Sequence, residues 1–467
     1  MDLFEEMRRY GDRTAVVDDR GRRFSYRELD RMAAEWGSHL PQGERALILL
    51  RTRNCVESLV GLLGGVSSGH VVLPVDHGLD AGLVARLMDA YRPEYVWGAG
   101  QETDPAVFTM GDYALTPTRY GPGQALHADL GVVLLTSGST GSPKGVRLTR
   151  ANIAANARSI AEYLALDDTE RPVTSLPMSY SYGLSVITSH LHVGATLLLT
   201  ETSVVRGEFW ELFRRYEATS FSGVPYTYEM LDTLRFPSID LPSLRYFTQA
   251  GGRMPTESVE RYTAEAERRG ARFYVMYGQT EATARIAYLP PDLVSRKPGS
   301  IGRAVPGGTL YLKDEHGERI AAPRQTGRLH YEGPNVMQGY AAGRADLASG
   351  DQLGGVLDTG DLAYADADGC YYVAGRRGRF VKLSGIRYDL DELERGLART
   401  GITCACGGSD EQLKVAIEDG AQARHVKQTL RRTFRVDPTQ VRVVAVPHIS
   451  RTATGKIAYA QTFENGE

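Results

Sequence analysis

The chain has 467 residues, 42% of them hydrophobic, and its 54 basic and 57 acidic residues leave a formal charge of −3. This length exceeds what one hydrophobic core usually serves, so we expect a large domain and at least one smaller one. The balanced charge gives no electrostatic reason to expect nucleic acid or an anionic membrane surface as a partner.

The N-terminal segment is acidic and lacks the apolar stretch of a signal peptide, and no run of about 18 apolar residues predicts a membrane span. Four cysteines are few for a disulfide framework in a chain of this length. We expect Cys404 and Cys406 to lie on a strand with their thiols on opposite faces. These features favour reduced thiols and a cytoplasmic protein, a monomer or a homodimer.

Short apolar runs alternate with helix-like segments through most of the chain. Residues 44–50 and 70–75 have the pattern of buried strands, and the segment 54–69 between them has helical apolar spacing. Residues 195–200 and 219–225 repeat the strand pattern, with a predicted helix at 209–217 between them. This alternation predicts an α/β fold with parallel sheets covered by helices.

The pattern changes after about residue 298, where glycine and proline cluster and strands with Gly-rich turns follow. We expect a β-rich subdomain over about 298–374, within an N-terminal core of residues 1–376. Residues 377–467 have a pattern of their own: a predicted helix at 389–399, predicted strands near 414–419 and 441–446, and a helix between those two strands. They predict a small C-terminal α+β domain.

The strongest chemical signal is the segment LLTSGSTGSPKG, Leu134–Gly145. Glycines let backbone N–H groups close around an anion, hydroxyls add donors, and Lys144 adds positive charge. The segment therefore predicts a phosphate-binding loop rather than a merely flexible turn. It differs from the P-loop of nucleoside triphosphatases, because Gly145 follows Lys144 where that motif requires Ser or Thr.

This loop resembles the signature loop of the superfamily of adenylate-forming enzymes, which contains acyl-CoA synthetases, peptide-synthetase adenylation domains and luciferases. Four later segments are similar to other motifs of that superfamily, in the same order: FYVMYGQTEAT (273–283), LDTGDLAYADADGCYYVAGR (357–376), GRRGRFVKLSGIRYDLDELE (375–394) and ISRTATGKIAY (449–459). The resemblance covers nearly the whole chain. It implies a large domain of helix-covered sheets with a small β-rich subdomain, and a small mobile C-terminal α+β domain.

The resemblance also implies ATP and Mg²⁺ as ligands. The loop residues expected at the phosphates are Thr136, Ser137, Gly138, Ser139, Thr140 and Lys144. Those expected at the adenine and ribose are Gly251, Gly252, Tyr277, Gly278, Asp361 and Arg376.

Three residues are predicted to take part in the chemistry. Thr280 would donate to the α-phosphate, and Glu281 would hold Mg²⁺ together with Thr140, because this cation prefers oxygen ligands. Lys456 is the predicted main catalytic residue, because its charge would stabilise the negative charge that develops at the α-phosphorus. Gly378 is expected at the hinge of the mobile domain, and Gly385 in the loop used for the second step.

Residues 175–197 align with the acid-binding segment of this superfamily, and the predicted pocket residues are Tyr180, Ser181, Tyr182 and Gly183. Ser181 stands where relatives that activate α-amino acids place Asp, so we expect an aryl or short acyl acid instead. The alternative for the two tyrosines is that they pack the core.

The sequence therefore predicts an AMP-forming acid ligase. It would adenylate a small carboxylic acid, release pyrophosphate, and transfer the acyl group to the thiol of CoA or of a carrier protein. One alternative is a diazotase-type enzyme that activates nitrite with ATP for transfer to an aryl amine. The other is a nucleotide-binding protein without enzymatic activity.

Overall fold

The computed structural model describes residues 6–100, 105–121, 123, 125–136, 144–376, 379–383, 386–409, 412–452 and 455–464. The chain forms two compact units. The first contains most residues up to Leu310 together with Tyr331–Leu357, and the second contains Tyr311–His330 and residues from Asp358 onward. No helix in the described ranges is long and apolar enough to cross a membrane.

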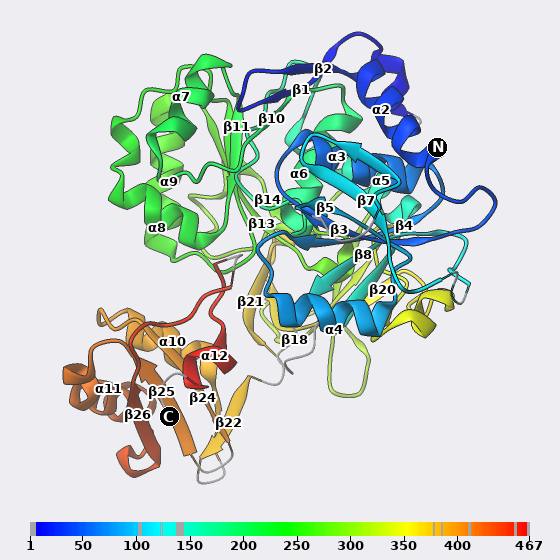
Figure 1. Cartoon of the computed structure of the whole chain (residues 1–467). Helices are drawn as coiled ribbons and strands as arrows, with labels where there is room; N and C mark the ends of the chain where they lie inside the picture. The colour runs from blue at the N-terminus through cyan, green and yellow to red at the C-terminus, as the bar shows by residue number, and fades with distance from the viewer. Residues whose placement is uncertain are drawn as a thin grey trace. The chain divides into compact units, whose positions relative to one another are not determined.

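The first unit is built on an eight-stranded sheet with the order β19-β9-β8-β4-β3-β5-β7-β6 (Figure 1). Its central strands are parallel to one another: β8 (Leu130–Thr136), β4 (Val71–Asp76), β3 (Leu47–Thr52) and β5 (Tyr95–Ala99). The strands at the two edges are antiparallel to their neighbours: β9 (Lys144–Thr149), β19 (Tyr340–Ala341), β7 (Tyr113–Pro117) and β6 (Phe108–Met110).

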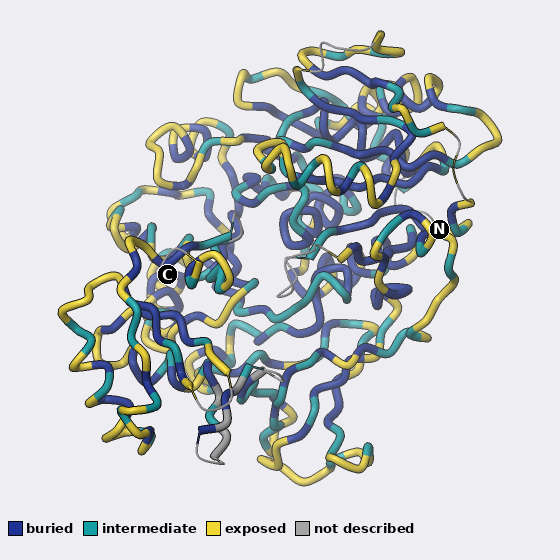
Figure 2. The backbone as a smooth tube through the Cα atoms, turned by 60° about the horizontal axis from the view of Figure 1, so that its bottom comes forward, coloured by how far each residue is buried: buried dark blue, intermediate teal, exposed yellow. Residues whose placement is uncertain are grey.

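The continuous apolar runs of the central strands are explained by burial on both faces. Ile48 and Leu50 face the cluster that contains α2 (Tyr26–Ser38) and α3 (Val56–Ser67), whereas Leu47 and Leu49 face the cluster that contains α4 (Ala81–Tyr91). Figure 2 shows buried residues (dark blue) in the interior segments of the chain and exposed residues (yellow) mainly in its outer segments.

A second sheet in this unit has the order β11-β12-β13-β14-β15. Its strands are β11 (Ser220–Gly223), β12 (Tyr246–Gln249), β13 (Arg272–Tyr277), β14 (Ala287–Leu289) and β15 (Arg303–Ala304), of which the first three are parallel. The helices α7 (Gly207–Arg215), α8 (Pro225–Thr233) and α9 (Thr256–Arg269) lie beside it in Figure 1. An aromatic core joins sheet and helices, because Phe221, Phe247 and Phe273 pack with Trp210 and Tyr262.

Two long helices and a small sheet complete the first unit. The helices are α5 (Arg150–Leu164) and α6 (Ser181–His192), and the sheet has the order β10 (Leu197–Leu199), β1 (Thr14–Asp18), β2 (Arg23–Ser25). A capping box begins α5, since the Thr149 hydroxyl accepts from the Asn152 N–H at 2.9 Å and the Asn152 side chain accepts from the Thr149 N–H at 2.9 Å.

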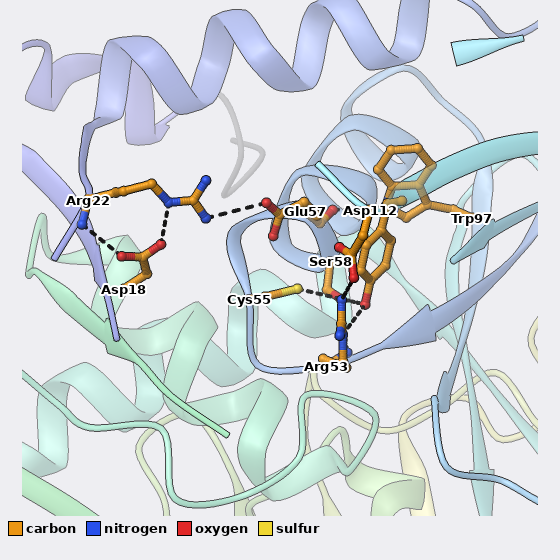
Figure 3. A network of polar contacts seen from close by, with 9 residues as sticks. Asp18, Arg22, Arg53, Cys55, Glu57, Ser58, Trp97 and Asp112 are labelled. Atoms are coloured by element: carbon orange, nitrogen blue, oxygen red, sulfur yellow. Dashed lines mark hydrogen bonds and ion pairs between the residues drawn. The ribbon is translucent and has the colours of Figure 1, made fainter. Parts of the chain in front are cut away.

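A polar network fixes the loop before α3 (Figure 3). The Ser58 and Tyr113 hydroxyls are 2.9 Å apart, and Ser58 also accepts from the Arg53 N–H at 3.0 Å. The next residue, Asn54, reaches the segment that leads into α6: its Nδ2 donates to the Leu176 carbonyl at 3.0 Å, and its Oδ1 accepts from the Met178 N–H at 3.1 Å. The start of the predicted acid-binding segment is therefore tied to the central sheet.

The remaining strands form three sheets. One has the order β17 (Arg319–Ile320), β16 (Thr309–Lys313), β18 (Gly327–Glu332), β20 (Val356–Ala365), β21 (Tyr371–Arg376). Strands β22 (Phe380–Leu383) and β23 (Ile386–Asp389) pair with each other, and β24 (Cys404–Ser409), β25 (Gln412–Ile417) and β26 (Val441–Ala445) form the third sheet. The accompanying helices are α10 (Leu390–Ala398), α11 (Ala423–Thr429) and α12 (Tyr459–Glu464).

The two cysteines of β24 correct one sequence prediction. Cys404 and Cys406 are buried in the same apolar cluster, whereas Ala405 between them belongs to another. The prediction of opposite faces is wrong, because residues two apart on a strand share a face. The adjacent Cys404 thiol and burial raise the pKa of the Cys406 thiol well above its ordinary value.

Candidate active site

Two loops expected to hold the nucleotide follow neighbouring parallel strands. Gly251 and Gly252 follow β12 after one intervening residue, Ala250, and Gly278 comes directly after Tyr277, the last residue of β13. The carboxyl ends of parallel strands meet at one edge of a sheet, which is where ligands of α/β proteins bind. The Gln249 amide donates to the Gly252 carbonyl at 2.7 Å and braces the first loop.

At Gly278 and Gly251 in these loops, and at Gly183 in helix α6, an added side chain would meet neighbouring atoms. A Cβ at Gly278 would lie 1.6 Å from the Ala284 carbonyl oxygen, and one at Gly183 would lie 2.1 Å from the Pro177 carbonyl oxygen. Gly251 has φ +86°, and a Cβ there would lie 2.5 Å from the Tyr180 hydroxyl. The expected approach of adenine to Gly251 and Gly252 remains a prediction.

The turn after β13 is strained and held from outside. It begins with a short 3₁₀ helix, Thr280–Ala282, after which Thr283 and Ala284 have φ angles of 59° and 151°. Non-glycine residues rarely adopt such angles, and structures keep them where the surroundings impose them. Asn335 holds this turn in place, because its Nδ2 donates to the Ala282 carbonyl at 2.8 Å and to the Arg285 carbonyl at 2.7 Å.

This turn meets the predicted acid-binding segment. The hydroxyls of Ser181, the first residue of α6, and Thr280 are 3.1 Å apart. Two residues predicted from separate motifs, one for the acid and one for the α-phosphate of ATP, are therefore in contact. The Tyr182 hydroxyl lies 2.6 Å from that of Thr248 on β12, so this tyrosine is part of the core as well as of the predicted pocket.

The turn also connects to the end of the predicted phosphate loop. The Tyr340 hydroxyl donates to the Glu281 carboxylate at 2.7 Å, and the Lys144 ammonium lies 5.7 Å from the centre of the Tyr340 ring. Thr136 and Lys144 pair across strands β8 and β9, where the Thr136 hydroxyl donates to the Lys144 carbonyl at 3.3 Å. Tyr340 was not predicted as a site residue, because no local motif marks it.

A second residue missed from the sequence is Arg285, although it lies only two residues after the motif at 273–283 that contains Glu281. Its guanidinium lies 4.1 Å from the centre of the Tyr182 ring, a cation–π arrangement. Burial raises the pKa of Tyr180 to about 12, partly offset by the Arg285 charge, and burial also raises the pKa of Tyr182. Both tyrosines therefore remain neutral hydrogen-bonding groups at physiological pH.

Glu281 fits a role in binding Mg²⁺. Its carboxylate has one oxygen engaged by Tyr340 and is half-buried on the turn that also carries Thr280. A carboxylate oxygen is the ligand this hard cation prefers, and Mg²⁺ is commonly held by one or two carboxylates and substrate phosphates.

Three of the predicted residues that the structure describes belong to the second unit. Asp361 on β20 is buried and pairs in register with Arg376 on β21, and its N–H donates to the Thr359 hydroxyl at 3.2 Å. Lys456 is exposed, and its N–H donates to the Thr452 hydroxyl at 3.2 Å. The other predicted residues lie outside the described residues: Ser137, Gly138, Ser139, Thr140, Gly378 and Gly385.

This site has the features of a nucleotide-binding α/β protein. Glycine loops lie at the edge of a parallel sheet, and the turn after β13 carries the Thr280 hydroxyl and the Glu281 carboxylate. Residues 3–341 match the family model described as "AMP-binding enzyme", and the chain belongs to this family. The family predicted from the sequence motifs is thereby confirmed.

Individual relatives agree with this assignment. The chain is 29% identical to oxalate–CoA ligase of Arabidopsis thaliana over 71% of this chain and 66% of that protein. It is 31% identical to indoleacetate–CoA ligase of Aromatoleum aromaticum, over 70% of this chain and 65% of that protein. The matches thus span just under two thirds of the length of these relatives.

A solved structure confirms the predicted fold class. O-succinylbenzoate coenzyme A synthetase from Bacillus subtilis, in complex with AMP, superposes with a TM-score of 0.80 at 21% identity. The match covers 100% of this chain and 99% of that one.

Proposed function

We propose that this protein is an AMP-forming acid ligase. It joins a small carboxylic acid to the AMP portion of ATP and releases pyrophosphate. It then transfers the acyl group to the thiol of CoA or of a carrier protein and releases AMP. Membership of the AMP-binding family supports the first step. The CoA ligases among its relatives support the second.

The observation that carries the proposal is the 3.1 Å contact between Ser181 and Thr280. In the first step a carboxylate oxygen of the acid attacks the α-phosphorus, and the bond from that phosphorus to the bridging oxygen of pyrophosphate breaks. Thr280 donates to the α-phosphate, while Ser181 lies beside the incoming acid. Holding both reactants at adjoining residues provides the proximity that such a reaction needs.

The remaining roles follow the sequence predictions. The loop from Thr136 to Lys144 binds the β- and γ-phosphates, and Glu281 with Thr140 holds Mg²⁺, which neutralises phosphate charge when bound. Asp361 accepts from the ribose hydroxyls and Arg376 reaches the ribose or α-phosphate. Residues 377–467 form the mobile domain, which turns at Gly378 and presents first Lys456 and then the loop around Gly385.

Substitution of Lys456 tests the proposal. Lys456→Ala should lower acid-dependent ATP–pyrophosphate exchange by about 100-fold or more, because loss of one electrostatic stabiliser of a transition state typically has this effect. ATP binding, measured by calorimetry, should remain. The matched control is Lys427→Ala on α11, which should leave exchange unchanged. Equal exchange in wild type and Lys456→Ala would remove this lysine from its role.

The same assay separates the alternatives. Absence of exchange across a broad panel of carboxylic acids, together with AMP release that requires nitrite and an aryl amine but no thiol, would replace the ligase by a diazotase-type enzyme. ATP binding without AMP release under either condition would indicate a binding protein.

A further inference from the structure

We propose that Arg285 binds a second anionic group of the acid substrate, so that the preferred substrates are compact diacids. This inference rests on the proposed ligase function and specifies its substrate class. It starts from a charge without a counter-ion: Arg285 is only 3% exposed, and no carboxylate in the described parts of the chain forms an ion pair with it.

The existing partners of Arg285 leave donors of the guanidinium unused. One terminal nitrogen donates to the Ala284 carbonyl at 3.3 Å, and the other reaches the Ser185 hydroxyl at 3.5 Å, which is at the limit of a hydrogen bond. The Tyr163 hydroxyl, which donates to the Met276 sulfur at 2.9 Å, also interacts with this guanidinium but carries no negative charge. The buried Nε has no partner among the described residues. A buried guanidinium usually has a paired anion, since burying a charge alone is unfavourable.

Other buried arginines of this unit have fuller sets of partners, as Arg147 donates to the Gln338, Ser349 and Gly350 carbonyls and Arg344 is paired with a carboxylate. Arg344 is similarly buried, and its two terminal nitrogens bond the two Glu94 oxygens at 3.0 and 2.7 Å. Arg285 instead lies against Tyr182, whose hydroxyl is bound to Thr248 and remains neutral. The ring stabilises the cation but does not neutralise it, so an anion that arrives from outside would find an unpaired partner.

The position of Arg285 fits a group carried by the acid. Ser181 contacts Thr280, and Ser185, four residues later on α6, contacts Arg285. Side chains four apart on a helix are neighbours, about 6 Å from each other. Thr280 at the reacting group and Arg285 at a second group would thus be about one helical turn apart. Malonate, succinate and phthalate carry two carboxylates on a short framework, so that one could be held at each of these residues.

Paired substrates test the inference. Wild-type protein is assayed by ATP–pyrophosphate exchange with malonate against acetate, succinate against propionate, and phthalate against benzoate. We expect a diacid to be preferred in at least one pair, and Arg285→Met to lower kcat/KM for that diacid by about 10- to 100-fold, as loss of a hydrogen bond to a charged group does. The loss should lie mainly in KM, and Arg285→Lys should restore part of it.

Thermal unfolding separates this role from a structural one. Arg285→Met removes a buried unpaired charge, so its unfolding midpoint should equal or exceed that of wild type. The matched control Arg344→Met breaks a buried ion pair and should lower the midpoint while leaving the preference for the diacid unchanged. A lowered midpoint in Arg285→Met with an unaltered preference would overturn the inference.

The remaining outcomes also decide the matter. Preference for the monoacids in all three pairs would overturn the inference and leave the ligase function standing. If no acid supports exchange, the ligase function fails. The anion site is then judged by malonate stabilisation of wild type relative to Arg285→Met, measured by thermal unfolding with ATP present. Equal stabilisation overturns it, and stabilisation confined to wild type supports it.

Discussion

At the scale of single residues, Gly278 provides a sharp test of the packing behind the site. A Cβ at this position would lie 1.6 Å from the Ala284 carbonyl oxygen and 3.0 Å from the Arg285 Cα. Backbone atoms cannot turn aside as a flexible side chain does. We expect Gly278→Ala to lower the free energy of unfolding by about 1–3 kcal/mol or more and to displace Thr280, so that acid-dependent exchange falls.

The matched control is Gly207→Ala. A Cβ at Gly207, the first residue of α7, meets no atom within 4 Å, and alanine is the better helix former. This variant should be as stable as wild type or slightly more stable in urea unfolding, with unchanged exchange. Equal stability of Gly278→Ala and Gly207→Ala would show that the loop relaxes freely and that its close packing is unimportant.

At the scale of elements, Asn335 holds the strained turn after β13. Its Nδ2 bonds two carbonyls of the turn, and its own carbonyl accepts from the Thr283 hydroxyl at 2.6 Å. Asn335→Ala removes both side-chain donors and leaves buried carbonyls unpaired, which typically costs about 1–3 kcal/mol for each group. We expect faster amide hydrogen exchange in residues 280–285 and a lower free energy of unfolding.

A neighbouring residue isolates this effect. The Tyr331 hydroxyl donates to the Asn335 Oδ1 at 2.7 Å, so Tyr331→Phe removes one bond to Asn335 and retains both bonds from Asn335 to the turn. The turn should then keep its protection against exchange, with a loss of stability of about 1 kcal/mol. Faster exchange of equal size in the two variants would mean that Asn335 does not hold the turn by itself.

The same elements show what local sequence can and cannot predict. The strands expected at 44–50 and 70–75 form as β3 and β4 because strands buried on both faces need unbroken apolar runs. Tyr340, which donates to the Glu281 carboxylate, lies 59 residues from Glu281 along the chain, and no local sequence pattern predicts their contact. The motif predicts that Thr280 and Glu281 belong together. Their contacts with Ser181 and Tyr340 depend on tertiary packing, which periodicity does not encode.

At the scale of the whole molecule, buried histidines should control stability at acidic pH. His190 donates from Nδ1 to the Val186 carbonyl at 2.7 Å, because a carbonyl only accepts, and its Nε2 therefore accepts from the Tyr246 hydroxyl at 2.7 Å. Both nitrogens of the neutral ring are thus satisfied. Burial lowers the pKa of His190 to about 4, and burial with the Arg45 charge lowers the pKa of His70 to about 4.

The direction of the pH dependence follows from these values. A histidine of the unfolded chain has a pKa of about 6.5. Between pH 6.5 and 4, His190 and His70 are therefore protonated in the unfolded state and neutral in the folded state. The contribution of these neutral histidines to the free energy of unfolding is therefore fully present above about pH 6.5 and is lost as the pH falls toward 4. The shift for His190 alone corresponds to about 3 kcal/mol. Urea unfolding at pH 7, 6 and 5 should show a progressive fall.

Substitution of His190 assigns that fall. His190→Gln cannot gain a proton, so its free energy of unfolding should decline less steeply between pH 7 and 5 than that of wild type, whatever its value at pH 7. The exposed His316 is the matched control, and His316→Gln should retain the wild-type slope. If His190→Gln kept the full wild-type slope, His190 would not be the source of the acid sensitivity. The fall in stability would then come from His70 or from the carboxylates.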